Sequence, residues 1–208
     1  MRIIVAPNPV LREKSEPVTV DEVKDLRSTA EQMAELMYAS QGCGLAAPQV
    51  GISKRLIVID VTPLDEDGEV VEKNPVYYIN PIIKRLWGEK ETCEEGCLSI
   101  PGIQINIERY NNIEVEALDL DGKTFTEKAD DFHARVLQHE LDHLEGTTMF
   151  EHLDPLERIE ALKEYEAALK AGAKPGDVSV KSNAGARGNS DVPSNADAPS
   201  NATTKREL

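Results

Sequence analysis

The spacing of apolar residues predicts a long helix near the start of the chain and another near residue 160. After Thr19, which has capping-box spacing with Glu22, apolar residues recur every three or four positions. This period indicates a helix of about five turns that ends near Gly42. The second helix is expected at 155–170. Its predicted apolar side consists of Leu156, Ile159, Leu162 and Leu169.

The region between these helices has the patterns of strands. Residues 56–61 form a continuous apolar run, which is typical of a buried strand, and later segments alternate between apolar and polar residues. Pro81 is expected to break one extended segment, and Asp121-Gly122 is typical of a hairpin turn. The composition of residues 62–74 indicates an exposed loop or a short hairpin. The expected strands are 56–61, 77–86, 103–107, 113–118 and 124–126.

The last part of the chain, from Ala171 to Leu208, differs in composition from the rest. Large apolar residues nearly vanish, and Ser-Asn-Ala recurs at Ser182, Ser194 and Ser200. Such a segment buries too little surface to offset the entropy lost on ordering. The sequence therefore predicts one catalytic domain at 1–170 and a disordered low-complexity tail at 171–208.

The charge and the cysteine count narrow the class of protein. The net charge of −15 argues against binding to DNA or RNA, since contacts to phosphate need clustered Lys and Arg. The sequence has neither an apolar run of roughly 20 residues nor a signal-peptide pattern, so we expect no membrane association. Three cysteines suit a reducing compartment better than a disulfide framework. We therefore expect a cytoplasmic protein.

The motif His139-Glu140-Leu141-Asp142-His143 carries the clearest chemical signal. Two histidines four residues apart lie on one face of a helix and can bind one metal ion. The helix has Asp130 as a candidate N-cap and Gly146 as a candidate C′ residue. Apolar residues on both of its faces indicate that it is buried, and buried histidines beside a glutamate are costly unless a group such as a metal ion satisfies them.

A third ligand is available upstream in Glu95-Gly96-Cys97-Leu98-Ser99. With Cys97, His139 and His143 as ligands, one position stays open for water, and the pKa of that water falls toward roughly 7. This is the layout of a hydrolytic centre rather than a structural one. Glu140 is suited to act as the general base that takes the proton of the water. Candidate donors for an oxyanion are the Gln49 side chain and the Leu98 backbone N–H.

Three segments resemble the three motifs of peptide deformylases, in the same order. They are residues 42–49 (GCGLAAPQ), 94–99 (EEGCLS) and 138–143 (QHELDH), and the resemblance extends from about Arg2 to Lys170. It implies an α+β fold with antiparallel β-sheets packed around a central helix that bears the histidines, and with N-terminal and C-terminal helices. It also implies removal of the formyl group from the N-terminal formyl-methionine of nascent polypeptides, with release of formate.

The resemblance also implies a role for each matching residue. The metal ligands would be Cys97, His139 and His143, with Glu140 as catalytic acid/base and with Gln49 and the Leu98 amide as oxyanion donors. Gly44 would bind the formyl-amide end of the substrate, and Cys43 and Val136 the methionine. Glu95, held by Arg109, would orient a ligand. The ion would be Fe2+, with Ni2+, Co2+ or Zn2+ able to take its place; a Cys-His-His set suits several divalent ions.

Two features depart from the family pattern. Position 43 is usually a branched aliphatic residue, and Cys43 is interpreted as a small buried apolar residue. Some relatives dock on the ribosome through basic residues of the C-terminal helix. Here acidic residues outnumber basic ones at 155–170, so docking by that route is not expected. The residues concerned are Glu157, Glu160, Glu164 and Glu166 against Arg158, Lys163 and Lys170.

Two other functions remain open from the sequence. A zinc endopeptidase also carries H-E-x-x-H, but it takes its third ligand downstream of the motif, which here would be Glu160 or Glu164. A degenerate family member would bind nascent chains or a partner without catalysis. The second alternative is disfavoured because every candidate catalytic position is intact.

Overall fold

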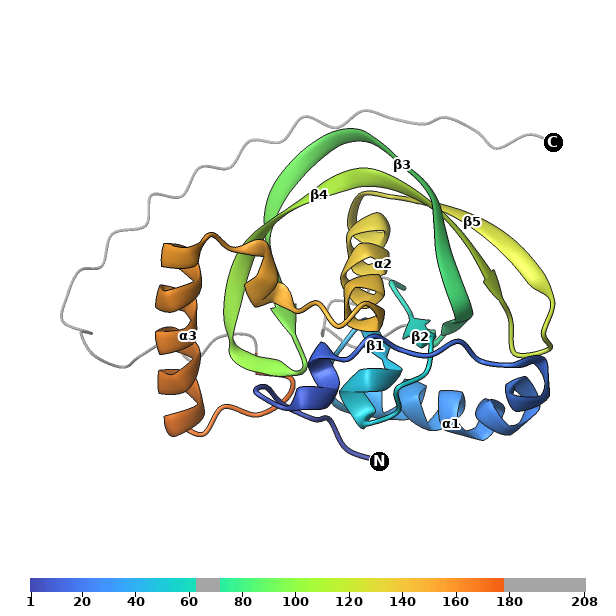
Figure 1. Ribbon diagram of the computed structural model, residues 1–208, viewed down its shortest axis with the longest axis horizontal. Helices are drawn as coiled ribbons and strands as arrows, with labels where there is room; N and C mark the ends of the chain where they lie inside the picture. Colours follow the sequence, from blue (N-terminus) through green and yellow to red (C-terminus); the bar gives the residue numbers. More distant parts are fainter. Residues whose placement is uncertain (63–71, 178–208) are drawn as a thin grey trace, which may run out of the picture.

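The computed structural model describes residues 1–62 and 72–177, and it has the predicted α+β architecture (Figure 1). Five strands form one antiparallel sheet in the order β1-β2-β3-β4-β5. The strands are β1 (Gly44–Ala46), β2 (Leu56–Ile59), β3 (Val76–Cys97), β4 (Ile100–Leu118) and β5 (Thr124–Asp130). The helices are α1 (Val20–Ala39), α2 (Asp131–Leu144) and α3 (Pro155–Lys170), with short 3-10 turns η1 (Pro9–Arg12), η2 (Ala47–Val50) and η3 (Met149–His152).

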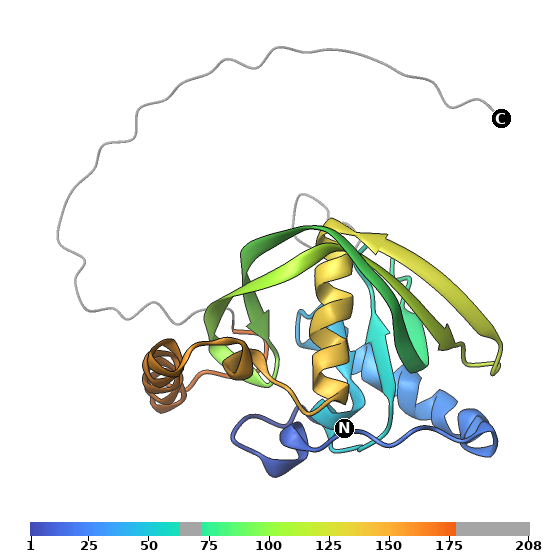
Figure 2. The ribbon, with the colours of Figure 1, turned by 45° about the horizontal axis from the view of Figure 1, so that its top comes forward.

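The two long strands β3 and β4 arch over α2, so that the sheet wraps around this helix (Figures 1 and 2). Four register shifts interrupt their pairing and allow the bend.

The expectation that Pro81 breaks an extended segment is wrong. The strand continues through Pro81, because the proline lies at the register shift between Ile79 and Ile82, where the regular pairing with β4 is interrupted. The two alternating segments 103–107 and 113–118 likewise belong to one strand, β4.

The predicted buried strand β2 lies between two helices. Ile57 and Ile59 point to α2 and share a cluster with Leu137 and Leu141, all almost fully buried. The alternate residues Leu56 and Val58 point to α1 and pack with Met33 and Met37. Because both faces are covered, the strand needs apolar residues at every position, which explains its continuous apolar run.

The predicted helix boundaries agree with the structure. Thr19 caps α1, and its backbone N–H donates to the Glu22 carboxylate. Asp130 is the N-cap residue of α2, and Gly146 follows its C-cap with φ = 71°. A side chain at Gly146 would also lie 2.6 Å from the carbonyl oxygen of Arg12, so this position needs glycine for two reasons.

The N-terminal segment, residues 2–18, hydrogen-bonds to all three motif-bearing regions of the chain. Its backbone N–H groups donate to carbonyl groups in η2, in the turn between β3 and β4, and at the end of α2. The three bonds are Ile4 to Gln49 (2.8 Å), Ala6 to Ser99 (2.9 Å) and Ser15 to Leu144 (2.8 Å). The segment therefore links regions that are far apart in sequence.

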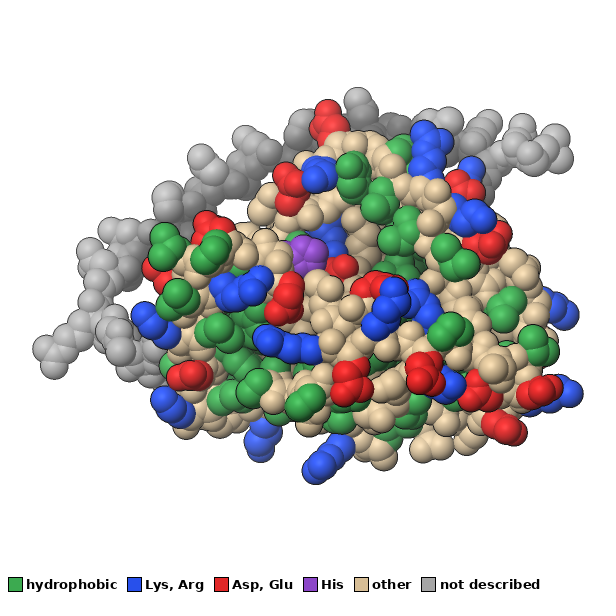
Figure 3. Space-filling model, viewed as in Figure 1, with side chains coloured by type: hydrophobic (Ala, Val, Ile, Leu, Met, Phe, Trp, Pro, Cys, Tyr) green, Lys and Arg blue, Asp and Glu red, His purple; other side chains and the backbone are tan. Residues whose placement is uncertain are grey.

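The apolar side predicted for α3 is correct for Leu169, which packs against the cluster that contains Phe150 and Tyr165, but it is wrong for the other three residues. Leu156 is 75% exposed, and Ile159 and Leu162 are also exposed. Figure 3 shows apolar side chains among charged ones over this helix. The face that packs on β4 and η3 instead carries Tyr165, whose hydroxyl donates to the Ala6 carbonyl, and Ala168. The spacing of apolar residues on α3 does not show which face of the helix packs against the rest of the protein.

Residues 171–177 leave α3 and return to the body of the protein. The Gly102 backbone N–H in β4 donates to the Asp177 carbonyl at 2.8 Å. The remainder of the tail predicted at 171–208 lies outside the described residues, as does most of the loop predicted at 62–74. Within the described ranges, no helix is both long enough and apolar enough to cross a bilayer.

A matched pair of leucine substitutions tests this account of the core. Leu137 is fully buried on α2, so Leu137→Ala should lower the free energy of unfolding by about 2–5 kcal/mol. Leu156→Ala on α3 should change it by less than about 0.5 kcal/mol, because its side chain is already in solvent. Urea unfolding followed by circular dichroism gives both values. Equal losses would contradict the assigned faces.

Candidate metal centre

Helix α2 and the end of β3 bring three ligand-type side chains together. His139 and His143 lie one turn apart on α2, and Cys97 is the last residue of β3. Their ligand atoms all lie within 4.8 Å of one another, and Cys97 Sγ is 3.3 Å from His143 Nε2. In a tetrahedral site, bond lengths of about 2.0–2.3 Å place neighbouring ligand atoms roughly 3.3–3.6 Å apart. The three side chains therefore fit one divalent ion.

The electrostatics of the cluster favour the thiolate that a metal requires. Burial alone would raise the pKa of the Cys97 thiol, but the imidazoles of His143 and His139 outweigh it and lower the pKa to about 5. A thiolate is the form of cysteine that binds a metal ion. The surroundings of Cys97 therefore favour its thiolate form even though the side chain is buried.

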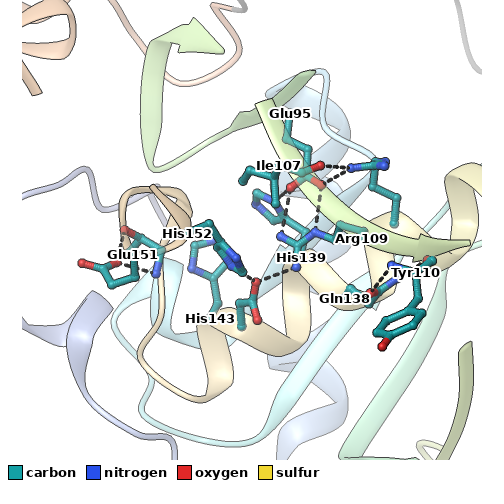
Figure 4. A network of polar contacts seen from close by, with 12 residues as sticks. Glu95, Ile107, Arg109, Tyr110, Gln138, His139, His143, Glu151 and His152 are labelled. Atoms are coloured by element: carbon teal, nitrogen blue, oxygen red, sulfur yellow. Dashed lines mark hydrogen bonds and ion pairs between the residues drawn. The ribbon is translucent and has the colours of Figure 1, made fainter. Parts of the chain in front are cut away.

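The Glu95 carboxylate orients His139 (Figure 4). Glu95 Oε2 is 2.9 Å from His139 Nδ1, which leaves Nε2 of the ring for an ion. Arg109 donates twice to the same carboxylate, at 2.8 and 3.0 Å. Burial raises the pKa of Glu95, but His139 and Arg109 hold it well below its ordinary value. The predicted partnership of Glu95 with a ligand and with Arg109 is thus present in the geometry.

Arg135 is a second cation on Glu95, and the sequence interpretation missed it. Its guanidinium donates to Glu95 Oε1 at 2.8 Å and to the carbonyl groups of Ile107 and Glu91. Helical spacing could have predicted this contact, because Arg135 lies four residues before His139 and therefore on the same face of α2.

Asp142 and His152 extend the network of Glu95 away from the cluster. The carboxylate of Asp142 accepts from Arg109 at 2.7 Å and contacts His152 in η3, also at 2.7 Å. No sequence pattern predicted the contact of His152 with Asp142, because the position of His152 depends on how η3 packs against the rest of the chain.

Glu140, the residue after His139 on α2, is buried. Its side chain is enclosed, and its Oε2 atom has no hydrogen-bond partner among the described residues. Burial raises the pKa of Glu140 to about 7. A β-carbon added to Gly44 would lie only 2.9 Å from Cγ and Cδ of Glu140. The small-residue segment 42–49 is therefore a backbone platform that the Glu140 carboxylate approaches closely at Gly44.

Gln49 is held so that its amide group faces the ligands. Its Oε1 accepts from the Ala46 backbone N–H at 2.7 Å, which fixes the orientation of the side chain. Its Nε2 is 3.6 Å from Cys97 Sγ and 3.2 Å from the Ser99 hydroxyl. The side chain is almost fully buried, so its position is well determined by its surroundings. An amide donor therefore lies beside the group formed by Cys97, His139 and His143.

A pocket of about 300 Å³ opens onto this cluster. Of the predicted site residues, only His143 does not line it, because it lies beneath the others. Phe132, at the start of α2 and 60% exposed, lines it as well and was not predicted, although it lies one turn before Val136. The predicted residues in the lining are Cys43, Gly44, Gln49, Cys97, Leu98, Val136, His139 and Glu140.

The endopeptidase alternative does not fit this geometry. It requires Glu160 or Glu164 as a ligand, and both are exposed on α3, which packs against β4 and η3. Among the described residues, the ligand-type group that gathers around the histidine pair contains Cys97 instead. The geometry therefore offers a candidate third ligand upstream of the helix and none downstream among the described residues.

Comparison with known sequences identifies the family. The sequence profile described as Polypeptide deformylase matches residues 1–159. The chain belongs to the peptide deformylase family. It is 43% identical over 174 residues to a peptide deformylase of Rhizobium meliloti, with 83% of this chain and 96% of that protein covered. A peptide deformylase of Phenylobacterium zucineum is 42% identical over 172 residues, covering 81% and 96%.

Solved structures of the family have the same fold. The peptide deformylase of Legionella pneumophila superimposes with a TM-score of 0.73 at 35% identity, covering 82% of this chain and 97% of that one. That of Synechococcus elongatus in complex with actinonin gives 0.70 at 40% identity, covering 82% and 88%. Peptide deformylases are metal-dependent hydrolases that remove the N-formyl group from nascent peptides, and this chain is one of them.

Glu95→Gln tests the role of the carboxylate behind His139. The substituted side chain lacks the negative charge with which the Glu95 carboxylate binds the two arginines and the His139 imidazole. We therefore expect metal affinity to fall about 10–100-fold. The control is Glu94→Gln, whose neighbouring carboxylate is exposed. Competition with a chromophoric chelator measures both affinities. Equal affinities in the two variants would contradict the assigned role.

Gly44→Ala tests the close approach of Glu140. The added methyl group must displace the carboxylate, and a shift of about 1 Å at a catalytic group costs on the order of 100-fold in rate. Gly42→Ala should cost much less, because its β-carbon meets the end of the flexible Leu98 side chain, with the contact to Cδ1 at 2.8 Å. Turnover with formyl-Met-Ala-Ser gives both rates. The reverse order of the two effects would rule out this explanation.

Proposed function

We propose that Cys97, His139 and His143 hold one divalent ion and that Glu140 is the general acid/base of deformylation. The single observation that supports this most is the convergence of a thiolate and two imidazoles beside the buried Glu140 carboxylate, whose Oε2 has no hydrogen-bond partner in the part of the chain that the structure describes. When bound, the ion supplies an activated water and a Lewis acid for the formyl group. With a pKa near 7, the Glu140 carboxylate is poised to accept a proton from the attacking water and to deliver it to the departing amine.

Gln49 and the Leu98 backbone N–H are the proposed donors to the oxyanion. The Gln49 amide is supported by its fixed orientation and by its position next to Cys97 Sγ. Leu98 follows Cys97 directly and also lines the pocket. Donors that are held in place before the reaction stabilise developing negative charge without reorganisation.

Cys43 and Val136 are the proposed walls of the methionine site, and the Gly44 backbone is the proposed contact for the formyl-amide end. Cys43 packs against the apolar cluster that contains Val136. Burial raises the pKa of the Cys43 thiol to about 12, so the residue stays neutral and behaves as a small apolar surface. A pocket of this size and lining is suited to an unbranched thioether side chain.

The proposed resident ion is Fe2+, on the basis of the resemblance to the family; a thiolate with two imidazoles would also accept Ni2+, Co2+ or Zn2+. The proposed location is the cytoplasm. In support, the three cysteines are unpaired, which is the state expected in a reducing compartment.

We do not propose ribosome docking through basic residues of α3. Arg158 on this helix donates to the Phe150 carbonyl at 2.7 Å, and Lys170 lies 4.0 Å from Glu166. The acidic residues of α3 are exposed, and charges of both signs are interspersed on the face shown in Figure 3. This helix therefore does not present the basic surface that contact with RNA phosphates needs.

Two substitutions test the assigned roles in protein purified without oxygen. Glu140→Gln should keep one metal ion per chain and lose about 10²–10⁴-fold in formate release from formyl-Met-Ala-Ser. Cys97→Ser should lose both the ion and the activity, because it removes the thiolate. Metal analysis of the wild-type protein should find iron. Formate release by Glu140→Gln at the wild-type rate would refute the acid/base assignment, and absence of activity in the metal-loaded wild type would favour a binding protein without catalysis.

A further inference from the structure

The chain beyond α3 reaches the catalytic pocket. Residues 171–177, which we call the strap, turn back from the end of α3 toward β4 (Figure 2). Within the strap, the Lys174 N–H donates to the Asp177 carboxylate at 2.7 Å and the Asp177 N–H donates to the Lys174 carbonyl at 2.9 Å. Ala173 packs on the apolar cluster between β4 and α3. The strap is therefore a compact turn attached to the body of the protein.

The strap connects two opposite parts of the pocket wall. On one side, Gly102 of β4 donates to the Asp177 carbonyl; β4 pairs with the end of β3 that carries Cys97. On the other side, Gly176 lies against the backbone after α1, since an added β-carbon would be 2.8 Å from the Ser40 carbonyl oxygen. Residues 41–44, which follow directly, line the pocket. Gly176 and Asp177 themselves are part of its lining.

The outer part of the pocket is negatively charged. Glu94 and Asp177 are both exposed acidic residues in its lining, and the Asp177 carboxylate keeps its charge while it accepts the Lys174 N–H. Arg135 is the one Lys or Arg in the described lining, and it is buried and engaged with Glu95 and two backbone carbonyl groups. The charge at the entrance is therefore not compensated by a neighbouring cation in the lining.

We propose that the strap is a specificity-determining element for the residues that follow formyl-methionine. This inference rests on the proposed function. The formyl group must reach the buried ligands, so the rest of the nascent chain leaves through the exposed entrance, where the strap lies. There the Asp177 carboxylate favours Lys or Arg over Asp or Glu at the second or third residue of the substrate. The functional catalytic unit then extends to Asp177, beyond the boundary at Lys170 that the composition suggests.

A charge-reversal experiment in the full-length chain tests this preference. Two peptide pairs are compared by kcat/KM: formyl-Met-Lys-Ser with formyl-Met-Glu-Ser, and formyl-Met-Ala-Lys with formyl-Met-Ala-Glu. In the wild type, the lysine peptide of at least one pair should be preferred about five-fold, the effect of one nearby charge in a hydrated site. Asp177→Lys should remove or invert this preference, and Asp177→Asn should reduce it. Glu164→Lys is the matched control, because it makes the same change in net charge on an exposed face of α3 away from the pocket.

A second pair of variants tests the position of the strap rather than its charge. Gly172 and Gly176 both have positive φ, at 91° and 99°, so a side chain strains each to a similar extent. Only at Gly176 does the new side chain also collide with the Ser40 backbone. Gly176→Val should therefore displace the strap and weaken the lysine preference, while Gly172→Val should preserve more of it.

The possible outcomes separate the two proposals. If the wild type releases no formate from any peptide, the proposed function fails. If the wild type is active but Asp177→Lys shows the same peptide ratios as Glu164→Lys, the strap proposal is overturned. A loss of preference in Asp177→Lys and in Gly176→Val, with Glu164→Lys unchanged, supports it.

Discussion

The buried carboxylate of Glu95 joins the strand and the helix that carry the proposed metal ligands. It lies two residues before Cys97 on β3, and it binds Arg135 and His139 on α2 and Arg109 on β4. Each of these charges would be costly to bury alone, and a buried charge that loses its partner destabilises a protein by several kcal/mol. The helix and the strand can therefore associate in few alternative registers. The relative placement of the thiol and the imidazoles follows from this one arrangement.

The bent sheet is the second condition for the site. The register shifts in β3 and β4 let these strands curve around α2, so that the end of β3 arrives beside the second half of the helix (Figure 1). The irregularities that interrupt ladder hydrogen bonds therefore have a geometric function, as β-bulges near active sites often do. Pro81 is accommodated for the same reason.

The sequence predicted those parts of the site whose signals are local. His139 and His143 share a helix face, and Cys97 and Gln49 occur in short motifs, so their convergence followed from the resemblance to the family. Interactions that depend on packing between distant elements were less accessible. The apolar residues of α3 repeat with helical spacing, but nothing in that spacing shows that Tyr165 rather than Leu156 faces β4. The polar composition after Lys170 did not predict that residues 171–177 pack on the protein, because their attachment depends mainly on backbone hydrogen bonds.

The backbone links of the N-terminal segment have a consequence for any change made at that end of the protein. Ile4, Ala6 and Ser15 hydrogen-bond to the platform, to the turn after Cys97 and to the end of the histidine helix. None of them lines the pocket. A fusion or deletion that displaces this segment would thus remove hydrogen bonds from the platform, from the turn after Cys97 and from the end of α2 at the same time. The effect would resemble a loss of metal affinity, although every residue of the proposed metal site would still be intact.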